Sequence, residues 1–143
     1  MKNNQEGSVL LKTACINPDI MRSLSLCGHG DKILIADGNY PLDSKSGNAA
    51  KVYLGLTNGV PEVTQVLEVL SQVVNFEKAE VMEPDGGQVP IFNEFQDILS
   101  GMELSRLKRF EFYDACCQSN VRLVISTGEK RTFANILLTV AAA

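Results

Sequence analysis

The single histidine of this chain, His29, is the residue best suited to exchange a proton with a ligand. It lies between two glycines in the stretch CGHGDKILIADGNYP (27–41), and Asp31 and Asp37 follow it closely. An imidazole titrates near neutral pH, so it can take up and return a proton without extreme tuning. Either aspartate could orient the ring or bind a hydroxyl. The alternative for His29 is a loop histidine with only a structural hydrogen bond.

Two further polar residues stand beside apolar runs. Asp37 follows the run KILIA and precedes a Gly-Asn turn, and open α/β sheets bind ligands at the carboxyl ends of their strands. Asn135 follows the polar loop GEKRT, and its amide can both donate to and accept from a ligand such as a sugar or an amide. Each has a structural alternative, since Asp37 could cap its own turn and Asn135 could satisfy backbone groups.

Several common kinds of site are absent from the sequence. It contains no phosphate-binding glycine loop and no serine in a nucleophile elbow. The four cysteines, Cys15, Cys27, Cys116 and Cys117, lack the spacing of zinc ligands, and we interpret them as thiols in a reducing cytosol. Any chemistry is therefore expected to be proton transfer that needs no cofactor and no metal.

Length and composition predict one soluble domain over residues 1–143. Hydrophobic residues make up 45% of the chain and charged residues 21%, as in ordinary globular proteins. A net charge of −4 and the lack of a basic stripe argue against a nucleic-acid partner. No apolar run is long enough to span a bilayer and no signal-peptide core is present, so we expect no membrane partner and a cytoplasmic location.

Hydrophobic spacing predicts strands that alternate with helices. Strands are expected at 32–37, 51–57, 78–83, 121–127 and 133–140, and helices at 17–28, 59–74, 91–102 and, from a weaker pattern, 109–119. Residues 1–8 are polar and expected to fray. The alternation indicates an α/β class. The residues alone therefore predict a small α/β domain with His29 and Asp37 at one end of a sheet.

Three segments resemble one known family. GHGDKILIADGNYP (28–41) resembles the signature of the D-ribose pyranase and L-fucose mutarotase family. RFEFYDA (109–115) is similar to its Arg-Phe-x-Phe-Tyr-Glu-Arg segment, and STGEKRTFANILL (126–138) to its Thr-Gly-Glu-x-x-x-Tyr-Gly/Ala-Asn segment. The resemblance, which runs from residue 9 onward, implies a compact α/β domain with a central, mostly parallel β-sheet flanked by helices. It also implies a ring-shaped homo-oligomer, commonly a decamer, with sites at subunit interfaces.

The resemblance also implies roles for single residues. His29 would be the proton donor, while Asp37, Arg109 and Asn135 would bind the sugar. Phe133 also lines the implied site, but it stands where the family has a tyrosine and so lacks the phenol hydroxyl. Exchange of anomers requires ring opening, in which the ring oxygen gains a proton and the anomeric hydroxyl loses one. A single group that titrates near pH 7 can serve both steps, without a cofactor or a metal.

Three functions are compatible with this resemblance. Arg109 before Phe-x-Phe-Tyr favours the L-fucose mutarotase branch, which interconverts α and β anomers. The stretch LTNGVPEVTQVLEVL (56–70) is as close to the ribose branch, so a D-ribose pyranase, which interconverts pyranose and furanose forms, is the alternative. The change at Phe133 leaves a non-catalytic sugar-binding homologue as the third hypothesis.

Overall fold

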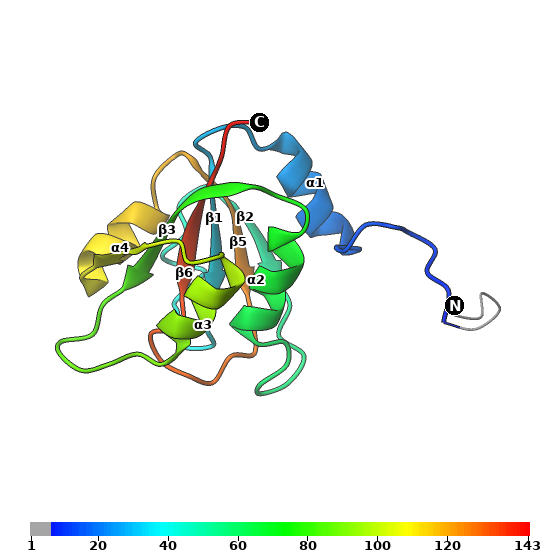
Figure 1. The fold of residues 1–143 in the computed structure, drawn as a ribbon. Helices are drawn as coiled ribbons and strands as arrows, with labels where there is room; N and C mark the ends of the chain where they lie inside the picture. Colours follow the sequence, from blue (N-terminus) through cyan, green and yellow to red (C-terminus); the bar gives the residue numbers. More distant parts are fainter. Residues whose placement is uncertain (1–6) are drawn as a thin grey trace.

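Strands whose central members are buried on both faces build one sheet with helices on both sides (Figure 1). The computed structural model describes residues 7–143 of the chain. Its elements are α1 (Pro18–Leu26), β1 (Lys32–Ala36), β2 (Ala50–Tyr53), α2 (Val63–Ser71), β3 (Phe76–Met82), α3 (Ile91–Ile98), β4 (Leu104–Leu107), α4 (Arg109–Cys116), β5 (Val121–Ser126) and β6 (Ile136–Val140). The sheet order is β2-β5-β1-β6-β3-β4.

Five of these strands run in one direction. β5 pairs in parallel with β1 and β2, and β3 pairs in parallel with β4, whereas β6 runs antiparallel between β1 and β3. The expected mostly parallel sheet is thus confirmed for the described residues. The carboxyl ends of β1 to β5 and the start of β6 lie at the same end of the sheet.

The two faces of the sheet carry separate hydrophobic cores. On one face, α1, α2 and α3 cover the strands, and side chains such as Leu67 and Phe95 are fully buried. On the other face, α4 and the loop that follows β1 cover the strands, with Phe112 and Cys116 fully buried. Figure 1 shows α2 and α3 in front of the sheet and α4 apart from them, at the left.

The ends of several elements differ from the predicted ones. The first helix begins as expected, because the Asn17 side chain accepts a hydrogen bond from the N–H of Ile20 at 3.0 Å. β2 ends at Tyr53 rather than at residue 57, because its neighbour β5 ends at the paired residue Ser126. A tight turn occupies the next residues, so α2 begins only at Val63.

Two strand predictions need correction. β4 was not predicted, because only one of its four residues is buried and its hydrophobic pattern is weak. The last strand begins at Ile136 rather than at Phe133, because the backbone of Phe133 has a φ of 55°, which no strand residue adopts. Phe133, Ala134 and Asn135 therefore form a turn that leads into β6.

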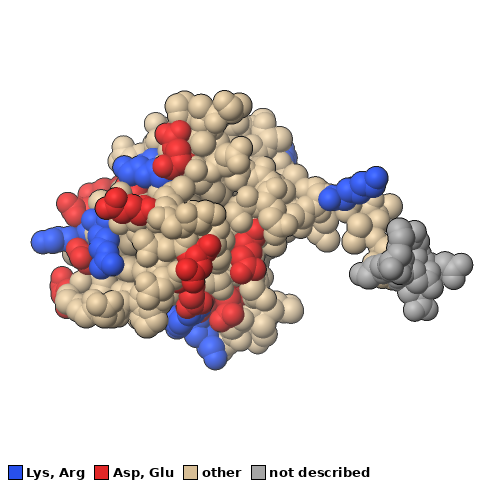
Figure 2. Space-filling model, in the orientation of Figure 1, with Lys and Arg blue, Asp and Glu red and all other residues tan. Residues whose placement is uncertain are grey.

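Some expectations concern the ends and the surface of the chain. The fraying expected for residues 1–8 falls mostly on residues 1–6, which lie outside the described residues. Within the described part, no helix is long and apolar enough to cross a membrane. On the face drawn in Figure 2, acidic and basic side chains of the described residues are interspersed, and no broad basic area stands out.

Candidate active site

A hollow of about 270 Å³ opens at the end of the sheet where the carboxyl ends of the parallel strands lie. Four of the residues predicted to form a site line it, namely Asp37, Arg109, Phe133 and Asn135. β1 delivers Asp37, the start of α4 delivers Arg109, and the turn before β6 delivers the other two. The remaining lining residues are Asn39, Tyr40, Met82, Tyr113 and Thr132. The fold thus joins four distant sequence segments around one cavity.

Asp37 is the most enclosed polar group of this hollow, with 2% of its surface exposed. Its Oδ1 accepts hydrogen bonds from the N–H groups of Asn39 and Tyr40, both at 2.9 Å, and its Oδ2 accepts from Ala134 at 3.1 Å. Burial raises the pKa of the Asp37 carboxyl, and these backbone donors offset part of that rise. Asp37 therefore caps its own turn, as the structural alternative predicted, while it also faces the hollow.

Asn135 ties the turn before β6 to the end of β1. Its Oδ1 accepts a hydrogen bond from the N–H of Asp37 at 2.7 Å. Within residues 7–143, no protein group accepts a hydrogen bond from its amide nitrogen, Nδ2. That nitrogen is a donor that a ligand hydroxyl can use.

Arg109 and Tyr113 form the outer wall of the hollow. Arg109 is exposed at the first position of α4, and Tyr113 follows one turn later on the same helix. The Tyr113 ring packs edge-on against Tyr40, with ring centroids 5.5 Å apart. Neither Tyr113 nor Tyr40 was expected at the site from the sequence. The i, i+4 spacing of Arg109 and Tyr113 was the signal that could have identified Tyr113.

An ion-pair cluster around the buried carboxylate of Glu129 anchors the loop that carries Phe133 and Asn135. The Arg131 guanidinium donates to Glu129 at 3.0 and 3.1 Å and to Glu94 of α3 at 2.6 Å. Burial tends to raise the pKa of Glu129, but the Arg131 bonds outweigh it and hold that pKa below its usual value. The loop GEKRT is therefore not simply a solvated loop.

A larger polar hollow of about 530 Å³ adjoins the first, and Asn39 lines both. Its walls come from the residues after β2 and β5, including Asn58 and Lys130. Of the residues predicted for the site, none lines this second hollow.

His29 lies away from both hollows, which corrects the expectation that it shares one end of the sheet with Asp37. His29 precedes β1, whereas Asp37 follows it. The five steps from Lys32 to Asp37 alone span about 16 Å of extended strand. Within one copy of the chain, the imidazole therefore cannot reach a ligand that is bound at Asp37.

A different carboxylate from the two expected ones orients the imidazole. His29 Nε2 lies 2.8 Å from Oε1 of Glu77, at the start of β3. Asp31 instead accepts a hydrogen bond from the N–H of Gly28 at 2.8 Å. Sequence reasoning missed Glu77 because it lies 48 positions from His29 and meets it only through strand pairing.

Comparisons with known proteins decide the family. Residues 10–143 match the RbsD / FucU transport protein family. The chain belongs to this family. The RbsD / FucU relatives include a protein named D-ribose pyranase from Staphylococcus haemolyticus, 36% identical over 132 residues, which cover 90% of this chain and 95% of the relative. The human protein named fucose mutarotase is 30% identical over 137 residues, 87% of this chain and 88% of the relative.

A solved structure of the same family has the same fold. Bacillus subtilis RbsD complexed with D-ribose superposes with a TM-score of 0.82 at 26% identity, over 94% of this chain and 99% of that chain. The family and the α/β architecture expected from the sequence are thereby confirmed.

Proposed function

We propose that this chain is a sugar mutarotase that interconverts the α and β anomers of L-fucose. The hollow that gathers Asp37, Arg109 and Asn135 at one edge of the sheet is the observation that carries this proposal. A relative named fucose mutarotase supports it. The free state of all four cysteines supports a cytoplasmic setting.

The groups around the hollow suit a neutral, hydroxyl-rich ligand. Arg109 and the Asn135 Nδ2 donate hydrogen bonds to sugar oxygens. Asp37 Oδ2 already accepts one backbone N–H, yet a carboxylate oxygen has a second lone pair that can accept a sugar hydroxyl. Phe133 and Tyr113 offer ring faces to the apolar side of the sugar. Together these groups hold the sugar ring in one orientation.

The proposed proton-transfer residue, His29, must then come from a second copy of the chain. His29 is exposed at the opposite end of the sheet from Asp37, so the His29 of a neighbouring subunit can lie against the hollow. We therefore include a homo-oligomer, a ring-shaped decamer, in the proposal. Each site would combine the hollow of one subunit with the His29 of the next.

The reaction would proceed through the open-chain sugar. The neutral imidazole would accept the proton of the anomeric hydroxyl and pass it to the ring oxygen as the C1–O bond of the ring breaks, which would leave an aldehyde and a free hydroxyl. Rotation about the C1–C2 bond exposes the other face of the carbonyl. Closure by the same hydroxyl then returns the proton and yields the opposite anomer.

D-ribose pyranase activity is the second candidate. The 36% identity with the S. haemolyticus protein of that name and the match with an RbsD complexed with D-ribose favour it. Arg109 before Phe-x-Phe-Tyr is the feature for which we place L-fucose first. A sugar-binding protein without catalysis is the third outcome that the experiment must distinguish.

Saturation-transfer NMR of the anomeric protons tests the proposal. L-fucose and D-ribose are each measured with and without the purified protein. Accelerated α–β exchange of L-fucose, lost in His29→Ala with oligomeric mass unchanged, is the expected result. Faster exchange of D-ribose alone would replace our choice with the pyranase. Binding of either sugar without acceleration would leave a binding protein.

A further inference from the structure

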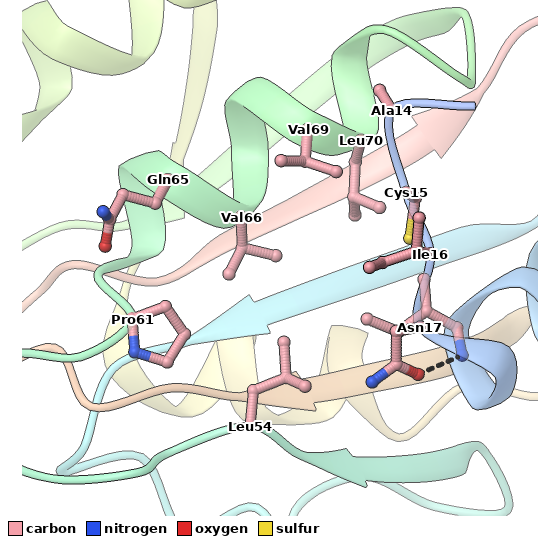
Figure 3. A pocket seen from close by; sticks show the side chains of 11 residues that line it. Ala14, Cys15, Ile16, Asn17, Leu54, Pro61, Gln65, Val66, Val69 and Leu70 are labelled. Carbon is pink, nitrogen blue, oxygen red and sulfur yellow. Dashed lines mark hydrogen bonds between the residues drawn. The ribbon is translucent and has the colours of Figure 1, made fainter. Parts of the chain in front are cut away.

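An apolar pocket of about 290 Å³ lies between α2, the residue after β2 and the chain that leads into α1. In Figure 3, Val66 and Leu70 of α2 point toward Leu54 on one side and toward Cys15 and Ile16 on the other. Hydrocarbon makes up nearly all of the wall. The pocket lies on the face of the sheet that carries α1 and α2, apart from the candidate active site.

The pocket is poorly suited to a polar small molecule. Sites for such ligands place a few polar groups to orient them. Here the two polar side chains of the wall are engaged in helix capping, since Asn17 Oδ1 accepts the N–H of Ile20 and Gln65 Oε1 accepts the N–H of Glu62 at 2.8 Å. The pocket is therefore expected to bind an apolar group.

The same chain carries an unburied apolar segment of this kind. Val9, Leu10 and Leu11 are consecutive, and 74%, 97% and 53% of their surfaces are exposed. This segment belongs to the arm, residues 7–14, which leaves the body and runs away from it (Figure 1). Where the arm meets the body, few charged side chains are visible (Figure 2). Three adjacent exposed large apolar residues are a recognised mark of an interaction site.

We propose that the arm of one copy docks, through Val9, Leu10 and Leu11, into the apolar pocket of a second copy, and that the second copy returns the same contact. Ala14, the last residue of the arm, lines the pocket together with Cys15 and Ile16, so two copies related by a twofold axis can place the start of each arm beside the partner's pocket. Six extended residues, 9–14, span about 20 Å, which is enough to cross such an interface. The contact does not depend on the proposed activity.

Particle mass in solution is the first test, measured by sedimentation velocity. Because a reciprocal contact joins copies in pairs, Leu10→Asp is expected to halve the mass of the particle. Ile16→Asp, which alters the exposed rim of the pocket, is expected to do the same. Leu26→Asp, at an exposed apolar residue of α1 outside the arm, is the matched control and should keep the wild-type mass. A Leu10→Asp protein of wild-type mass, or a monomeric wild type, would overturn the proposal.

Cross-linking tests which pocket the arm enters. Leu10→Cys is combined with Cys27→Ser and Cys117→Ser, so that the buried pocket thiol Cys15 is the intended partner. Mild oxidation should join position 10 of one chain to Cys15 of another and give a covalent dimer on a non-reducing gel, with the linked peptides identified by mass spectrometry. A link within one chain would mean that the arm folds back onto its own pocket, which would refute the proposal, as would the absence of any link.

Discussion

At the scale of single residues, the contact between His29 and Glu77 decides which ring nitrogen is available for chemistry. A carboxylate can only accept a hydrogen bond, so Glu77 Oε1 at 2.8 Å requires Nε2 to carry a proton. In the neutral imidazole, Nδ1 then holds the lone pair. Nδ1 is therefore the atom that would exchange a proton with the sugar in the proposed reaction.

The variant Glu77→Gln tests this assignment. A glutamine amide can also donate, so it no longer selects one tautomer, and we expect kcat for anomer exchange to fall about tenfold, a part of the ~10²–10⁴-fold that positioned acid–base catalysis supplies. KM should stay unchanged because Glu77 contacts His29 and is not one of the proposed sugar-binding groups Asp37, Arg109 and Asn135. Nitrogen-15 NMR of the His29 ring should show loss of the single tautomer. The exposed Glu103→Gln variant is the control, and equal kcat values for both variants would reject the role of Glu77.

Tyr113 can supply the phenol that position 133 lacks, because both residues line the same hollow. Removing one neutral hydrogen bond typically costs about 0.5–1.5 kcal/mol, so Tyr113→Phe should raise KM roughly two- to tenfold with little change in stability. Adding Phe133→Tyr to that variant should recover part of the affinity. Kinetics of the two single variants and the double variant measure this coupling. Purely additive effects would mean that the two rings act separately.

The sequence predicted the residues of the hollow better than their partners. Asp37, Arg109, Phe133 and Asn135 were named from motifs, and the structure brings them together. His29 and Asp37 lie at opposite ends of the sheet because the strand between them runs its full length. No local sequence pattern shows this. Partners such as Glu77 are set by the pairing of distant strands, which hydrophobic spacing does not encode.

At the scale of elements, the loop between β5 and β6 is held by electrostatics rather than by regular structure. Arg131 connects Glu129 to Glu94 of α3, and the side chain of Glu129 also accepts the first N–H of α2, from Val63, at 3.3 Å. Glu129 and Arg131 together thus tie this loop to two helices. The position of Asn135 in the hollow depends on that tie.

This tie predicts a pH dependence of stability. The folded-state pKa of Glu129 lies below its ordinary 4.5, so its contribution is present in full above that pH and is lost as pH falls through the folded value. Glu129→Gln should therefore lower the free energy of unfolding at pH 7 and flatten its decline in acid. Urea unfolding at pH 7 and pH 3 measures both effects, with the exposed Glu103→Gln as control. An acid slope as steep as that of the wild type would contradict this role.

Most elements were predictable because their hydrophobic periods are strong. The α2 segment repeats buried residues at helical spacing, and β1 is an unbroken apolar run. β4 was not predicted because Leu104 is its single buried residue. The start of β6 was misplaced because Phe133 looks like a strand residue, while its positive φ comes from the turn that Asp37 and Asn135 organise.

At the scale of the whole molecule, the separation of His29 from the hollow predicts that inactive variants can complement each other. His29→Ala and Arg109→Ala should each be strongly impaired, since each site would lack one half. Refolding them together at equal amounts should give about a quarter of the sites an intact His29 and an intact Arg109 from different copies. Exchange rates of the mixture and of the separate variants provide the measurement.

Matched controls make this result interpretable. Mixing Arg109→Ala with Asn135→Ala, two changes in the same hollow, should restore nothing, because the hollow of every copy then carries one of the two changes. Recovery in both mixtures would refute a shared site. If neither mixture recovers activity although its particles have the wild-type mass, His29 and the hollow have unrelated roles.

The place of β6 within the sheet has a consequence for how the protein is made. β6 comes last in the order of elements, yet it lies between β1 and β3 and joins them. A nascent chain that lacks it holds two partial sheets, β2-β5-β1 and β3-β4, each with an unpaired apolar edge that invites aggregation. The bond between Asp37 and Asn135 spans 98 positions, so the hollow also assembles only when this strand arrives. During translation the protein should therefore depend on chaperones until β6 has left the ribosome.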